Sequence, residues 1–85
     1  MAILKIVSVF DVAAQAFGRP VFVASEGVAV RSFSDEVNRE AVDNEMNKHP
    51  EDFILYYLGT WNDSDGVILF EDKHVLITGK NVIRS

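Results

Sequence analysis

The sequence contains no cysteine and only two histidines, so most of the side chains that build metal and thiol chemistry are missing. Without cysteine there are no disulfides and no thiolate zinc sites, which fits a reducing compartment. His49 and His74 lie far apart in the sequence and belong to no HxxxH or HExxH motif. A glycine-rich phosphate loop and a nucleophile elbow are also absent from the sequence. We therefore expect no catalytic site, no metal and no cofactor, and we predict that the protein is not an enzyme.

Long apolar runs are lacking as well. Residues 3–10 are largely apolar, but Lys5 interrupts them, and they lack the charged leader region of a signal peptide. No stretch approaches the roughly 20 apolar residues of a membrane span. We expect a cytoplasmic protein with no membrane partner.

Positive charge is scarce. Eight lysines and arginines stand against 13 acids, for a net charge of −5. Twelve of the acids fall within residues 25–72, whereas residues 73–85 carry three cations and no acid. A solvated acidic helix face accounts for this distribution without any function. A molecule that shows one positive surface to a phosphate backbone is the other interpretation, and both stay open.

Hydrophobic residues, in contrast, make up 48% of the 85 residues. This favours a single domain over residues 1–85, at the low end of the size that folds without disulfides or metals. Because so small a core is marginal, we also predict a homodimer, which would bury more apolar surface. Residues 79–85 begin with Gly-Lys-Asn and are predicted to form a flexible tail.

The hydrophobic pattern predicts an α+β fold, with an antiparallel sheet of four to five strands and one main helix. Ser25 is the expected helix N-cap, and Val30, Phe33 and Val37 recur on one face of a helix from about residue 26 to about residue 41. Its continuation or re-formation to about residue 47 stays open, with Pro50 ending it at or before His49. Strands are predicted at residues 3–10, 21–23, 53–61, 67–70 and 74–78, with turns at 62–66 and 71–73. The predicted order is β-β-α-β-β-β, and an OB-like barrel is the alternative.

Two adjacent tyrosines, Tyr56 and Tyr57, must point to opposite faces of the strand 53–61. One of them leaves the helix-covered face, where it can serve a dimer contact or stack on the bases of a single-stranded nucleic acid. Strict alternation along this strand places Trp61 on the same face as Tyr57.

Four blocks of sequence carry a resemblance to a known family. They are Arg-Pro-Val-Phe at 19–22, Gly-Val-Ala-Val-Arg-Ser-Phe at 27–33, His-Pro-Glu-Asp-Phe at 49–53 and Tyr-Leu-Gly-Thr-Trp at 57–61. Through them, roughly residues 3–70 resemble the small nonstructural DNA-binding proteins of gokushoviruses, single-stranded-DNA phages of the microvirus family. The resemblance implies a bacteriophage protein of the host cytoplasm that assists viral DNA replication at the switch to single-strand genome synthesis. It brings no catalytic residues.

Some positions of this sequence match the family pattern. Most have structural explanations, but core packing does not require an arginine at position 19 or 31. The matching positions are Arg19, Gly27, Arg31, Phe33, His49, Pro50, Phe53 and Gly59.

Two functions remain open. The first is single-stranded DNA binding, favoured by the basic termini and the sheet aromatics. The alternative is a regulator that binds viral or host replication proteins without touching DNA, which the acidic middle of the chain favours. The candidate nucleic-acid-binding residues are Arg19, Arg31, Tyr56, Tyr57, Trp61, Lys73 and Lys80.

Overall fold

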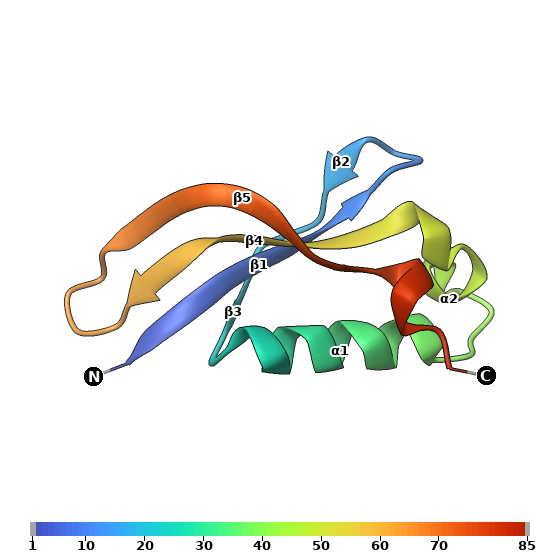
Figure 1. Cartoon of the computed structure of the whole chain (residues 1–85), viewed down its shortest axis with the longest axis horizontal. Coiled ribbons are helices and arrows are strands. Elements are labelled where there is room, and N and C mark those ends of the chain that lie inside the picture. Colours follow the sequence, from blue (N-terminus) through green and yellow to red (C-terminus); the bar gives the residue numbers. More distant parts are fainter. Residues whose placement is uncertain (1, 85) are drawn as a thin grey trace.

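The computed structural model describes residues 2–84, in which a curled antiparallel sheet has one long helix along one of its faces (Figure 1). The elements in chain order are β1 (Ile3–Asp11), β2 (Ala16–Phe17), β3 (Val21–Val23), α1 (Glu26–Asn38), α2 (Glu45–Lys48), the 3-10 helix η1 (Pro50–Asp52), β4 (Phe53–Asn62), β5 (Ile68–Thr78) and the 3-10 helix η2 (Gly79–Val82). The strands lie in the order β2-β1-β4-β5, with β3 beside β1, and the sheet stays open. The α+β class is confirmed, and the fold is not the alternative barrel. Among the described residues, no helix is long and apolar enough to cross a membrane.

The predicted order of elements needs two corrections. Three strands precede the helix, because the connection after β1 contains the short strand β2. The predicted strands 67–70 and 74–78 are parts of one strand, β5, and residues 71–73 are not a turn. Gly59 pairs with Phe70 while Tyr57 pairs with His74, so β5 holds three residues where β4 holds one. The surplus residues form an irregularity within the strand, and the chain does not reverse there.

Helix α1 begins as predicted and ends earlier. The Ser25 hydroxyl accepts a hydrogen bond from the Val28 amide at 3.2 Å, as an N-cap does. The helix ends at Asn38, because the buried side-chain amide of Asn44 donates to the backbone carbonyls of Glu36 and Arg39, both at 2.8 Å. The Glu36 carbonyl also accepts from the Arg39 amide at 3.2 Å, so the Asn44 side chain adds a second bond there and supplies one to the carbonyl of the C-cap residue Arg39.

The core lies between α1 and the middle of the sheet. Its buried members are Val7, Ala29, Phe33, Val37 and Leu55. Val30 is partly buried and packs against them. Phe33 and Val37 of the predicted helix face are therefore buried against Leu55 of β4, and Val30 only partly.

The C-terminal segment, for which the sequence predicts a flexible tail, is placed against the helical layer. A side chain at Gly79 would collide with the backbone oxygen of Pro50, so η2 and η1 are in close contact. The Asn38 side chain donates to the Val82 carbonyl at 2.9 Å, and Arg84 forms a 2.7 Å ion pair with Asp35 of α1.

Candidate nucleic-acid interface

The two faces of the sheet differ in what covers them. Val7 and Leu55 face α1 and belong to the core. Alternation along β1 and β4 places their neighbours Ser8 and Tyr56, which pair with each other, on the opposite face. We call this second face, opposite α1, the open face.

Tyr57 lies on the α1 side and is only 4% exposed. Its hydroxyl donates a 3.0 Å hydrogen bond to Glu71, and its ring centroid is 5.0 Å from that of His74. Burial, and secondarily the Glu71 carboxylate, raises the pKa of the Tyr57 phenol above its ordinary value. The predicted site residue Tyr57 therefore shows little of its ring to a base.

Three rings gather on the open face, and we call Phe10, Phe17 and Tyr56 the aromatic cluster. The centroid separations are 4.7 Å for Phe10–Phe17, 5.3 Å for Phe17–Tyr56 and 6.2 Å for Phe10–Tyr56. Phe10 and Phe17 are cross-strand partners of β1 and β2. The turn between these strands uses Gln15 at φ 55° and an Asp11 carboxylate that accepts from two following amides. Phe17 remains exposed, so the cluster meets solvent.

A lysine accompanies these rings. The Lys73 ammonium nitrogen lies 5.0 Å from the centroid of Phe17 and 5.8 Å from that of Tyr56. Both distances are within cation–π range. The fold thus brings together two of the residues proposed from the sequence, Tyr56 and Lys73, and adds two phenylalanines outside the predicted site.

Trp61 lies farther along the same face, and the sequence-based assignment of its direction is wrong. Val7 pairs with Tyr57 and Ile6 with Gly59, so Leu58 is an extra residue in β4. This irregularity reverses the alternation beyond it, as a one-residue shift must. Trp61 therefore shares the face of Tyr56, and its ring centroid is 5.5 Å from that of Phe22 on β3.

The other predicted cations are placed elsewhere. Arg31 is an exposed residue of α1, and Lys80 is an exposed residue of η2, which packs against α1. Arg19 follows β2 and borders an apolar groove between α1 and β3, a groove that Glu36 also lines. Among the candidate cations Arg19, Arg31, Lys73 and Lys80, it is Lys73 that lies beside the aromatic cluster.

Most of the acids lie on the helical side of the molecule. Eight of the twelve acids between residues 25 and 72 occur in the segment 26–52, from α1 to η1. Glu71 is bonded to Tyr57 on the same side. Asp63 and Asp65 lie in the turn between β4 and β5. The helical layer, and not the aromatic cluster, therefore carries most of the negative charge.

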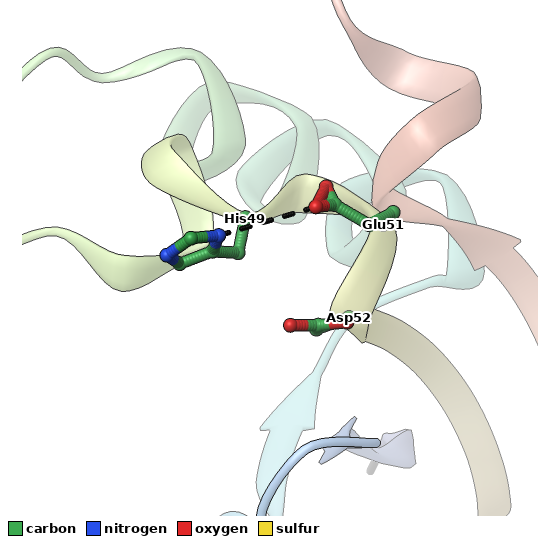
Figure 2. Close-up of side chains that lie close together, drawn as sticks. All are labelled: His49, Glu51 and Asp52. Carbon is green, nitrogen blue, oxygen red and sulfur yellow. Dashed lines mark ion pairs between the residues drawn. The ribbon is translucent and has the colours of Figure 1, made fainter.

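One group of potential metal ligands occurs at the turn into η1, where His49, Glu51 and Asp52 offer atoms within 4.8 Å of one another (Figure 2). His49 lies 4.0 Å from Glu51 and 3.8 Å from Glu45, and all three side chains are more than half exposed. Weak exposed ion pairs explain this arrangement, and it supports no metal site.

The fold and the open face define a small α+β protein with a partly exposed aromatic surface beside a cation. Its sequence matches the family described as Phage ORF5 protein over residues 4–82, so the chain belongs to this family of phage proteins. The match includes the aromatic cluster and Lys73. No curated protein and no solved structure matches the chain.

Proposed function

We propose that this protein is a non-enzymatic phage accessory protein that binds single-stranded DNA on the open face of its sheet. The observation that carries the proposal is the Lys73 ammonium group beside the Phe17 and Tyr56 rings, at 5.0 and 5.8 Å. Bases stack on exposed rings with about 1–3 kcal/mol each, whatever their sequence. A neighbouring ammonium group can neutralise the phosphate that joins two stacked bases.

The length of the open face also supports this proposal. Tyr56 and Trp61 are both in β4 and share this face, so the two groups of rings follow one strand. At about 3.3 Å per residue, the two residues are roughly 15 Å apart. This distance corresponds to about four stacked nucleotides at 3.4 Å each. A short single strand could therefore contact the aromatic cluster and the Phe22–Trp61 pair together.

The net charge of −5 opposes DNA binding, and the fold reduces this opposition by placing most acids in the α1–η1 layer. Since few cations adjoin the rings, stacking would supply most of the affinity. We therefore expect moderate affinity and a shallow dependence on salt, with a slope near −0.7 for each phosphate neutralised.

The narrower part of the proposal is a role at the switch to single-strand genome synthesis in the host cytoplasm. It is supported by the resemblance of the four sequence blocks to gokushovirus nonstructural proteins. Membership of the Phage ORF5 family supports the phage setting.

The test is fluorescence anisotropy of a labelled oligothymidylate at low salt. Tyr56→Ala should weaken binding about 5- to 150-fold, the equivalent of one lost stack. Tyr57→Phe, a change on the buried side, should leave the affinity unchanged. If the parent protein does not bind at low salt, the proposal fails. The regulator that binds viral or host replication proteins would then be the better function, supported by the acidic α1–η1 layer.

A further inference from the structure

Strand β5 forms an edge of the sheet, and its outer part exposes apolar side chains on both faces. The exposed fractions are 45% for Ile68, 59% for Leu69 and 79% for Phe70. Neighbouring strand residues point to opposite faces, so neither face of this segment is covered. Protein edges of this kind usually carry lysine, proline or inward-pointing charges that block further pairing. The segment 67–70, Val-Ile-Leu-Phe, has none of these.

The backbone of this segment directs specific groups outward. The Asn62 amide donates to the Val67 carbonyl at 3.0 Å, so these two residues form a hydrogen-bonded pair of the β4–β5 ladder. Hydrogen-bonded and non-hydrogen-bonded pairs alternate in an antiparallel ladder. Ile68, opposite Trp61, and Phe70, opposite Gly59, are therefore non-hydrogen-bonded toward β4. Their N–H and C=O groups point to the free edge.

We propose that the outer part of β5 pairs antiparallel with the same segment of a second copy of this chain, with Leu69 opposite its own counterpart. A two-fold axis across an antiparallel pair requires one residue to face its own copy. With Leu69 on the axis, Ile68 faces Phe70 of the second copy, and the outward groups of both can form about four hydrogen bonds. The two Leu69 residues then form a non-hydrogen-bonded pair, in which Cα atoms approach to about 4.5 Å.

The exposed apolar surface of this segment amounts to about half of the area that a standard interface needs. Together with Val67, the exposed portions of this segment equal roughly two whole large side chains, on the order of 400 Å². A standard stable interface buries about 800 Å² per partner. The segment would supply about half of this area from its apolar side chains alone.

Because residues 71–73 are irregular, regular pairing with the second copy is confined to residues 68–70 of β5. The middle residue of this segment is Leu69.

The test is the mass of the full chain in solution by sedimentation velocity, with two opposite charges placed on the proposed axis. Leu69→Lys and Leu69→Glu should each be monomeric, because each places like charges face to face across the axis. An equimolar mixture of the two variants should recover the dimer, since Lys then faces Glu. Val42→Lys, at an apolar position that is 88% exposed outside β5, is the matched control and should remain dimeric.

A second variant tests the backbone. Ile68→Pro removes an outward N–H and no hydrogen bond to β4, so it should give a folded monomer by circular dichroism. A monomeric parent protein would overturn the proposal, as would a Leu69→Lys variant that stays dimeric. A mixture that remains monomeric would exclude Leu69 from the axis. Because the readout is mass, these outcomes are independent of DNA binding.

Discussion

The Lys73 ammonium group lies 5.0 Å from the ring centroid of Phe17, although β5 and β2 are at opposite ends of the strand order β2-β1-β4-β5. A flat sheet would hold these strands apart, since neighbouring strands are separated by about 4.8 Å. The sheet must therefore curl, as Figure 1 shows for β5, and this curling brings a cation to the aromatic cluster. The irregular stretch of β5 includes Lys73, and such irregularities increase local bending.

Lys73→Gln should weaken single-strand binding and reduce the magnitude of the slope of log K against log salt by about 0.7, the loss of one phosphate contact. Anisotropy titrations of the labelled oligothymidylate over a series of salt concentrations would measure both effects. Lys48→Gln, an exposed change on α2, is the control and should alter neither the affinity nor the slope. An unchanged slope for Lys73→Gln would remove this lysine from the DNA contact.

Gly59→Ala should destabilise the fold by about 1–3 kcal/mol, because a Cβ there would collide with the backbone oxygen of Leu69 on β5. Thermal or urea unfolding monitored by circular dichroism would measure the loss. Gly27→Ala makes the same chemical change inside α1, where the nearest atom is the Ser25 hydroxyl at 3.8 Å. That variant should be neutral or more stable, by up to about 1 kcal/mol. Equal stability of the two variants would contradict the close contact of β4 with β5.

Local chemistry explains which parts of the fold were predictable. Ser25 caps α1 through a bond to a residue three positions away, and the spacing of Phe33 and Val37 follows from helical geometry alone. The end of α1 was not predictable in this way. It depends on Asn44, whose amide returns to the helix across a loop.

The candidate site was less predictable because it depends on irregular pairing. Leu58 is recognised as an extra residue only from the pairing of β4 with β1. Because of it, Trp61 points to the same face as Tyr56. A strand pattern read along one segment contains no information about such a shift. In the sequence, Phe10 and Phe17 cannot be distinguished from ordinary core residues. The curling of the sheet places Lys73 over Phe17.

Tyr57 should make the stability of the fold depend on pH in the alkaline range. An ordinary tyrosine ionises near pH 10. Burial and the hydrogen bond to Glu71 raise the pKa of Tyr57 in the folded state, so the folded chain keeps a proton that the unfolded chain has already lost.

The stability contributed by the Tyr57 phenol is therefore fully present below the unfolded pKa, near pH 10, and is lost as pH rises through the folded pKa. Urea unfolding at increasing alkaline pH should show this loss in the parent and a smaller loss in Tyr57→Phe. In Tyr56→Phe, the single remaining tyrosine should ionise above the ordinary range when tyrosinate absorbance is followed. Ionisation at the ordinary pH in that variant would mean that the Tyr57 phenol is solvated, against its contact with Glu71.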